Sequence, residues 1–436
     1  MTRQSPLMSL NYLTMVANRC TILTSRFISR SQLLQCVEVF RSTSATSSQQ
    51  LPNTMTPTSP FTHHFDIRSD TTYLNHGSFG ITPTCVKQVR DEWTRRLEEQ
   101  PMDFLCRVQT DAIHDAKQRL AEFLNTAASN LAFVDNATWA MNVIAGCFPL
   151  STGDNVVITD HEYGAVTRVW QRTCETKATQ LRTATLPTYI HDVDEILDSI
   201  FSACDDNTRL IIVSHITSAT AITLPIKEIC ERAKREGILV CVDGPHALAQ
   251  LDVDLAELGC DFYTASCHKW LCAPLGSGFV YIAPEHHQWV QTPVLSWGLI
   301  PPTLPQTWDD EFVWVGTRNI AAYLSIPAAI EFMTEIGFDT FRDYTFNLSH
   351  TARKTLLQEF SGACLVADDR QWYGTMAHVQ LPDGDCESLQ RTLWEKHHLE
   401  VPIIEWQEKR YVRVSSHLYN TSADLEQLVT ALKVEL

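Results

Sequence analysis

The sequence lacks the features that mark several common protein classes. Its 436 residues contain no uninterrupted apolar run that approaches the roughly 20 residues of a membrane-spanning helix. No cysteine pair has the C-x-x-C spacing of zinc ribbons, and no G-x-G-x-x-G turn follows a strand, which excludes a nucleotide-binding dehydrogenase. Positive charge is scarce, because 34 Lys and Arg face 51 Asp and Glu and leave a net charge of −17. Such a surface repels phosphate backbones, so we expect no nucleic-acid partner and no membrane association.

What remains is the composition of a large globular protein. Hydrophobic residues make up 44% of the chain and charged residues 19%, which suits a sizeable core and two lobes. The 14 cysteines are scattered, and some, such as Cys241 in ILVCVD, lie within apolar runs. We therefore expect reduced, buried thiols in an intracellular protein rather than a disulfide framework.

Residues 1–54 differ from the rest of the chain. They hold five arginines, no lysine and one acid, Glu38, and they are rich in Ser and Thr. This composition is typical of a mitochondrial transit peptide. A disordered extension, or translation from Met55 with the protein in the cytoplasm, is the alternative. In either case we exclude this segment from the fold.

From about residue 130, short β-branched runs alternate with stretches of helical character. Runs of this kind, nearly all apolar and separated by helices, predict an α/β fold with a mostly parallel sheet. Pro225 fits the first position of one such helix. Ligands bind at the carboxyl ends of the strands in these sheets. The predicted strands are 155–160, 209–216, 238–243, 261–266 and 278–283.

After Trp297 the composition and the pattern of predicted elements change. A loop rich in Pro and Trp is followed by helical stretches at 326–337 and 341–360, and then by short strands alternating with helices. This pattern predicts a smaller C-terminal α+β lobe. We divide the chain into an arm and large domain at 55–310, and a connecting helix and small domain at 311–436.

Two residues at neighbouring strand ends carry the chemistry. Asp243 closes the run ILVCVD, and Lys269 follows DFYTAS with a glycine-rich turn behind it. Pyridoxal 5'-phosphate (PLP) needs a lysine amine for its aldehyde and a carboxylate against its pyridine nitrogen. Taken alone, the pair also fits a surface lysine and a strand-terminal aspartate.

Longer motifs decide between these interpretations. The segment VDGPHALAQLDVDLAELGCDFYTASCHKWLCAPLGSGFVYI strongly resembles the class V aminotransferase family of fold-type I PLP enzymes. The motifs YLNHGSFG (73–80), HEYGAV (161–166) and WVGTRN (314–319) are similar to its isopenicillin N epimerase-like branch, which also holds cysteine carbon–sulfur lyases. The resemblance implies PLP, the fold-type I architecture, and a homodimer whose active sites are shared between subunits.

The resemblance also implies roles for individual residues. Lys269 matches the lysine that bonds the cofactor, and Asp243 matches the carboxylate on its pyridine nitrogen. Arg413 matches the arginine that binds the substrate carboxylate, with Asn75 and His76 as further pocket residues. The remaining cofactor-binding matches are the phosphate turn Asn136, Ala137 and Thr138, then Ser266, His268, Tyr163, His246, Ser218, and Thr317 from the second subunit.

Several of these residues have a structural alternative. Asn136 could be a simple helix cap, Tyr163 a packing residue and Ser218 part of a turn. The adjacent pairs His63–His64, His286–His287 and His397–His398 suggest metal ligands, but neighbouring side chains point apart. We interpret all six as surface residues and expect no metal site.

The motifs leave the reaction open between three outcomes. Cysteine desulfurases need a cysteine on a loop shortly before the substrate-binding arginine, and residues 397–413 contain none. We therefore expect a carbon–sulfur β-lyase that acts on cysteine or an S-substituted cysteine and releases pyruvate and ammonia. Epimerisation of an amino acid and transamination are the alternatives within the family. A non-catalytic binding protein is the alternative outside it, although such a protein would be free to lose Lys269.

Overall fold

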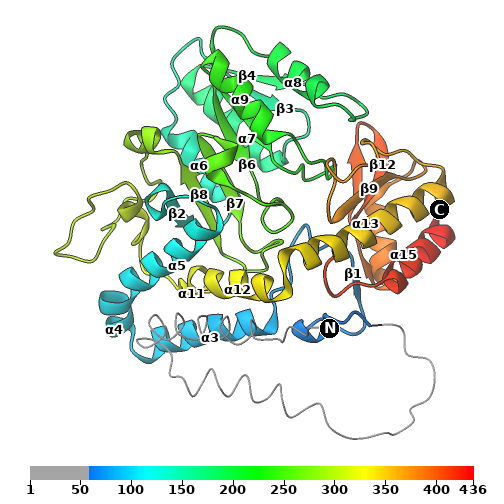
Figure 1. Cartoon of the computed structure of the whole chain (residues 1–436), viewed down its shortest axis with the longest axis horizontal. Coiled ribbons are helices and arrows are strands. Elements are labelled where there is room, and N and C mark those ends of the chain that lie inside the picture. The colour runs from blue at the N-terminus through cyan, green and yellow to red at the C-terminus, as the bar shows by residue number, and fades with distance from the viewer. Residues whose placement is uncertain (1–57) are drawn as a thin grey trace, which may run out of the picture. The chain divides into compact units, whose positions relative to one another are not determined.

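A seven-stranded sheet organises the larger part of the molecule (Figure 1). The structure is a computed structural model that describes residues 58–436, so the predicted transit segment at 1–54 lies outside it. Every neighbouring pair in the sheet is parallel except the two pairs that β8 makes. In spatial order the strands are β2 (Leu131–Val134), β8 (Gly278–Ile282), β7 (Phe262–Ser266), β6 (Leu239–Asp243), β5 (Thr208–Ser214), β3 (Asn155–Thr159) and β4 (Gln180–Ala184).

Helices cover both faces of this sheet because its central strands are apolar on both sides. In β6, Cys241 packs into one core and its neighbours Val240 and Val242 into the other. The first core is closed by α6 (Ala137–Cys147) and α7 (Gly164–Lys177). The second is closed mainly by α3 (Thr84–Glu99), α5 (Gln109–Phe123), α8 (Val193–Ser202), α9 (Ile226–Glu236), α10 (Leu255–Leu258), α11 (Ala321–Leu324) and α12 (Ile326–Ile336), with the short α4 (Pro101–Asp103) between α3 and α5.

A smaller lobe has its own sheet and its own core. Its antiparallel strands lie in the order β11 (Ile403–Trp406), β12 (Lys409–Ser415) and β9 (Met376–Gln380). The long helix α13 (Phe338–Phe360) links the lobes, since Phe341 packs in the large core and Leu348 in the small one (Figure 1). The lobe is completed by α14 (Cys386–His397), α15 (Ser422–Glu435), and the paired strands β10 (Leu399–Glu400) and β1 (Thr72–Tyr73). Leu74, the residue after β1, also packs in the small core.

The structure confirms the predicted α/β class and the mostly parallel sheet. The five predicted runs correspond to β3, β5, β6, β7 and β8, but β1, β2, β4, β10 and β11 were not predicted. The helices α11 and α12 pack in the large core, so the small lobe's own core does not begin at 311. Pro225 caps α9 instead of occupying its first turn.

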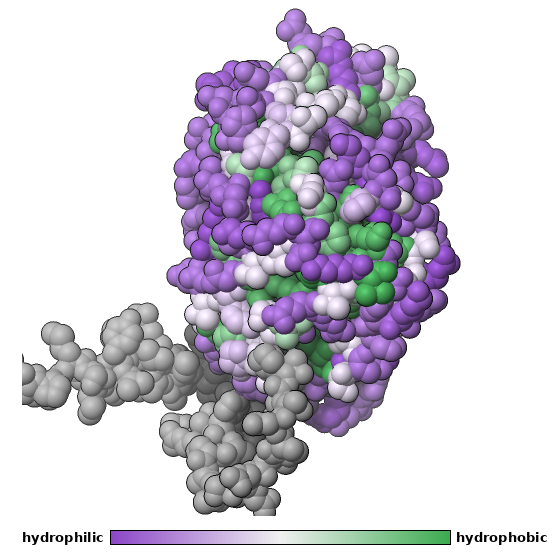
Figure 2. Space-filling view, turned by 90° about the vertical axis from the view of Figure 1, so that its right-hand side faces the viewer, coloured by the Kyte–Doolittle hydropathy of each residue, from purple (hydrophilic) through white to green (hydrophobic). Residues whose placement is uncertain are grey.

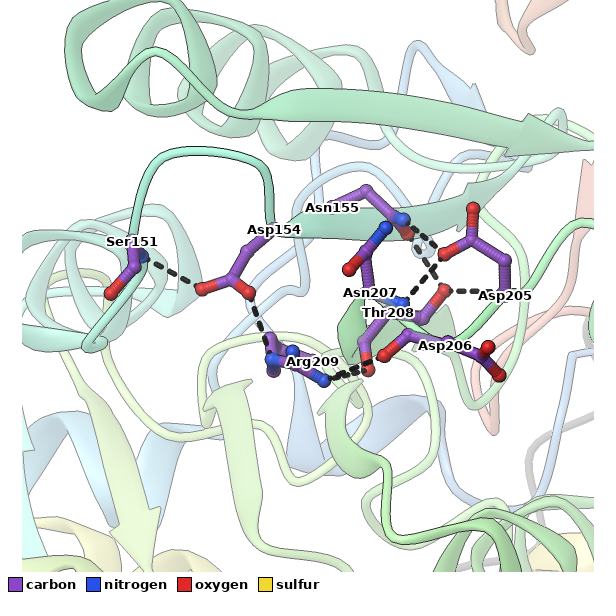
Figure 3. Close-up of polar contacts among 8 residues, drawn as sticks. All are labelled: Ser151, Asp154, Asn155, Asp205, Asp206, Asn207, Thr208 and Arg209. Carbon is purple, nitrogen blue, oxygen red and sulfur yellow. Dashed lines mark hydrogen bonds and ion pairs between the residues drawn. The ribbon is translucent and has the colours of Figure 1, made fainter.

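At the amino ends of β3 and β5, away from the strand ends that carry Asp243, a polar network joins the two strands (Figure 3). The buried Asn155 donates from Nδ2 to Asp205 Oδ1 at 2.7 Å and accepts from Thr208 Oγ1 at 2.8 Å. Arg209 donates to Asp154 Oδ1 at 2.8 Å. The β3–β5 register shifts between Asn155 and Val156, and these contacts fix it there.

Two features of the rest of the described chain bear on the sequence predictions. The cysteines are free, and Cys174, Cys230, Cys241, Cys260, Cys267 and Cys272 are buried. The prediction that His286 is a surface residue is wrong, because it is buried with Nε2 2.8 Å from Asp261 Oδ1.

The surface agrees with the composition. On the side of the small lobe it is mostly hydrophilic, with apolar residues in a discontinuous band between polar side chains (Figure 2). Within residues 58–436, no helix has both the length and the apolar character that crossing a membrane requires.

Candidate active site

A pocket of about 540 Å³ opens at the carboxyl ends of the central strands. The large lobe supplies most of its wall, and β12 of the small lobe contributes Arg413. The position is the one expected for a ligand in an open parallel sheet. The wall brings together most of the residues predicted from sequence: Asn136, Ala137, Thr138, Tyr163, Ser218, Asp243, His246, Ser266, His268, Lys269 and Arg413.

Asp243, the last residue of β6, is a buried carboxyl group at the floor of this pocket. Thr264 on β7 donates a hydrogen bond to its Oδ1 at 2.7 Å. Burial raises the pKa of Asp243 to about 6, and the hydrogen bond from Thr264 and the charge of Lys269 act in the opposite direction. A carboxylate held in this way attracts a cationic partner strongly.

Lys269 lies beside His246, and a third residue fixes how they meet. The indole Nε1 of Trp270 donates to His246 Nδ1 at 3.1 Å, and His246 Nε2 lies 3.0 Å from Lys269 Nζ. Because an indole N–H only donates, the neutral imidazole carries its proton on Nε2. With this tautomer, the amine of Lys269 accepts the hydrogen bond in its neutral form. Consistently, burial and the nearby Arg413 lower the pKa of Lys269 to about 7.

The amino end of α6 borders the opposite part of the wall. Asn136 caps the helix by accepting from the Trp139 N–H at 3.0 Å, and the Ala137 N–H donates to Ser266 Oγ at 2.9 Å. The N–H of Thr138, at the second helical position, has no acceptor within the helix, so this end can bind an anion. A Cβ on Gly278 would lie 2.9 Å from the Asn136 Cα, which explains the glycine there.

Arg413 is a buried guanidinium without a negative partner. It donates to the Ser218 carbonyl oxygen and to Ser78 Oγ, the latter at 2.9 Å, while its Nε has no partner. Among the described residues, no carboxylate forms an ion pair with it, and burial lowers its pKa to about 10. A planar guanidinium in this state is suited to bidentate binding of a carboxylate.

Three predicted site residues do not reach this pocket. Asn75 donates to Glu400, and His76 is buried behind the wall, stacked on His417, with Nε2 3.1 Å from the Lys269 carbonyl oxygen. The pocket is lined instead by the next three residues of that motif, Gly77, Ser78 and Phe79. Thr317 is exposed and lies outside the pocket of its own chain.

Glu162 is a residue beside the pocket that the sequence analysis missed. It follows β3 within the quoted motif HEYGAV and accepts hydrogen bonds from Thr159 and Ser214. The available signal was an acid three residues beyond the end of a strand, within a motif already singled out.

Comparison with known proteins identifies the family. The model of the family described as Aminotransferase class-V matches residues 92–428. The chain is 33% identical to isopenicillin N epimerase of Streptomyces clavuligerus, over 82% of this chain and 93% of that protein. The chain belongs to the class V aminotransferase family.

Two further comparisons concern one sequence relative and one solved structure. A probable chloroplastic L-cysteine desulfhydrase of Arabidopsis thaliana is 28% identical, over 86% of this chain and 84% of that protein. The solved structure of the cystine C–S lyase C-DES with its product, cysteine persulfide, has a TM-score of 0.74 at 21% identity, covering 84% of this chain and 97% of that one. At that identity the likeness concerns the fold alone.

The pocket of this class V enzyme fits PLP, the cofactor of the family. Lys269 has an uncharged amine for the aldehyde, Asp243 a carboxyl for the pyridine nitrogen, and α6 begins with an N–H group free for the phosphate. When bound, PLP supplies a ring that accepts the electron pair left on the substrate's α-carbon. In such a reaction Lys269 would take the α-proton, and Arg413 would hold the substrate carboxylate.

Proposed function

We propose that the protein is a PLP-dependent carbon–sulfur β-lyase for cysteine or an S-substituted cysteine. The α-proton and the sulfur substituent leave the amino acid together as a thiol, or as hydrogen sulfide from cysteine itself. Water then hydrolyses the remaining aminoacrylate to pyruvate and ammonia. The observation that carries the proposal is the make-up of the pocket wall. It contains Lys269, Asp243 and Arg413 but no cysteine among the described residues. Elimination of sulfur as a free leaving group needs no protein thiol, whereas persulfide transfer does.

In the proposed reaction each of these residues has a part. Arg413 binds the α-carboxylate, which places the α-carbon between the two lobes. Lys269 removes the α-proton as a neutral amine, since its pKa of about 7 keeps much of it uncharged at neutral pH. Loss of the β-substituent then follows without a further protein base, because a thiolate is a good leaving group.

Epimerisation is a second candidate, favoured by the 33% identity with isopenicillin N epimerase. It requires a second proton donor across the substrate from Lys269. Tyr163, which lines the pocket and is 50% exposed, is a candidate for that task.

Pyruvate release separates the two candidates. The PLP-loaded protein is incubated with L-cysteine, cystine, S-alkyl cysteines and their sulfoxides, with Lys269→Ala as the control. We expect pyruvate and ammonia in equal amounts from at least one substrate, and none from the control. Absence of pyruvate from every substrate, with the absorption of bound cofactor intact, contradicts the lyase and leads to chiral analysis for an epimerised product.

We also propose that two copies form a dimer in which each completes the other's site. Phe79 lines the pocket yet is 63% exposed, and Leu275, Leu295 and Trp297 are exposed apolar residues that a partner would cover. Thr317 would then serve the partner's pocket. Sedimentation equilibrium at micromolar concentration should give twice the mass of the chain, and a monomer would contradict the dimer.

Finally, we propose that residues 1–54 direct the chain to mitochondria, on the strength of their arginine-rich, acid-poor composition. A fluorescent fusion of the full chain should co-localise with a mitochondrial marker, and a fusion that begins at Met55 should not. Identical distributions of the two fusions would contradict the proposal.

A further inference from the structure

Glu162 is a carboxyl group next to the site that the proposed reaction does not use. Its Oε1 accepts from Thr159 Oγ1 at 2.8 Å and from the Ser214 N–H at 3.1 Å, and its Oε2 accepts from Ser214 Oγ at 2.6 Å. These donors stand at the carboxyl ends of β3 and β5. Three donated hydrogen bonds favour the ionised form of a carboxyl group.

Ser214 connects this group to the site. It lines the pocket, and in the β5–β6 register it is paired with Asp243. The two carboxyl groups therefore stand on either side of one strand-end residue. Burial raises the pKa of Glu162 to about 7, and the like charge of Asp243 adds to the shift in the same direction.

No cation compensates Glu162 within its own surroundings. Within residues 58–436 no Lys, Arg or His forms an ion pair with it. The titratable groups that face it are Asp243 and Cys241, both on β6, with Lys269 beyond Asp243. A partly buried carboxyl group without a cation is costly to ionise, and a positive charge that arrives with a ligand would offset that cost.

We propose that Glu162 is a positioning residue that holds a second negative charge behind Asp243 and so keeps the pyridine nitrogen of bound PLP protonated. Asp243 contacts the nitrogen, and Glu162 acts through Asp243 and Ser214. Two carboxylates attract the pyridinium proton more strongly than one. The inference rests on the cofactor, not on the choice between lyase and epimerase.

The test needs no substrate, so it is independent of the reaction. The visible absorption of bound PLP is titrated with pH in the wild type, in Glu162→Gln, and in Glu175→Gln, which removes an exposed charge from α7. Losing a negative charge disfavours protonated forms of the cofactor, so we expect the midpoint in Glu162→Gln to move roughly half to one pH unit to acid. Glu175→Gln should leave the midpoint unchanged, and Glu162→Asp, which keeps the carboxyl group, should have a midpoint close to that of the wild type.

A midpoint in Glu162→Gln equal to that of the wild type would overturn the proposal. Circular dichroism of each cofactor-free variant checks the fold. If Glu162→Gln does not fold, Thr159→Val replaces it, because the loss of one donor makes the carboxyl group harder to ionise while the side-chain volume is kept. A shift to acid in that variant supports the proposal, and no shift contradicts it.

Discussion

The Nε2 atom of His246 lies 3.0 Å from Nζ of Lys269, with its hydrogen pointing towards the amine. The indole of Trp270 imposes this arrangement from the far side of the imidazole. The lysine therefore meets a donor instead of an acceptor. This removes one of the usual means by which proteins keep a lysine charged.

In the cofactor-free protein, Lys269 should react with amine reagents at neutral pH. Burial and Arg413 lower its pKa to about 7, so labelling should be half-maximal near that pH. Arg413→Gln removes a neighbouring positive charge and should move the midpoint to higher pH by roughly one unit. The rate is followed by peptide mass spectrometry, with Lys269→Ala for background. An unchanged midpoint in Arg413→Gln would show that the two charges do not interact.

Arg413→Lys should weaken binding of the amino acid more than it slows the chemistry. An ammonium group cannot form the two parallel hydrogen bonds of a guanidinium, so we expect KM to rise roughly 10- to 100-fold. Steady-state kinetics on the best substrate measure this, and a kcat that falls by much more than KM rises would contradict it. Conversely, Arg370→Lys alters an exposed ion pair and should leave both parameters unchanged.

Asn155→Ala should destabilise the protein without changing its activity. The variant leaves Thr208 and Asp205 without the amide that joins them, at the end of the sheet remote from the pocket (Figure 3). Loss of buried hydrogen bonds costs about 1–3 kcal/mol. Urea denaturation gives the free energy of unfolding, and kinetics at saturating PLP test the second half of the prediction. A stability equal to the wild type would show that water replaces the amide.

Glu162 and Asp243 should make the cofactor-free protein lose stability as the pH rises. Burial raises the pKa of Glu162 from 4.5 to about 7 and that of Asp243 from 3.8 to about 6. The folded state thus binds more protons than the unfolded state between about pH 4 and 7. This stability is fully present below the unfolded pKa values and is lost as the pH passes the folded ones. Glu162→Gln removes the contribution of Glu162 to this pH dependence and leaves that of Asp243.

Denaturation at several pH values checks this expectation. The wild type and Glu162→Gln should have similar free energies of unfolding near pH 4.5. The wild type should then become progressively less stable than the variant towards pH 7. Two curves that run parallel would contradict the raised pKa of Glu162.

Mixed dimers test whether Thr317 serves the partner's pocket. Lys269→Ala and Thr317→Tyr should each be inactive as homodimers, the first for lack of the amine and the second because a bulky ring would block the phosphate site. Co-expressed in equal amounts, they should regain roughly a quarter of the wild-type activity, since half of the dimers are mixed and half of their sites are intact. No recovery in mixed dimers of confirmed composition would remove Thr317 from the site.

The sequence predicted the strands that are apolar throughout and the residues that follow them. Asp243 and Lys269 were identified because the long motif that contains both resembles the class V family. As a pair alone they also fit a strand-terminal aspartate and a surface lysine. In contrast, β4 reads QLRTA and lies at the edge of the sheet with exposed residues, so its composition carries no apolar signal. The strands β2 and β11 were not predicted because they are only four residues long.

Side chains whose partners lie far away in the sequence could not be placed in advance. His76 stands in the same motif as the pocket residue Ser78, but its ring is held by Tyr419 and His417 from the other end of the chain. Similarly, the donors that surround Glu162 come from two different strands, and only the folded sheet brings them together.

Arg413 spans the two lobes before any substrate arrives, through the Ser218 carbonyl and the Ser78 hydroxyl. The carboxylate oxygens of an incoming amino acid must replace these two acceptors on Arg413. An amine without a carboxylate cannot replace them, so the hydrogen bonds from Arg413 to Ser218 and Ser78 remain. Discrimination against simple amines therefore comes from an interaction already made within the protein, and it operates before the chemistry at Lys269 begins.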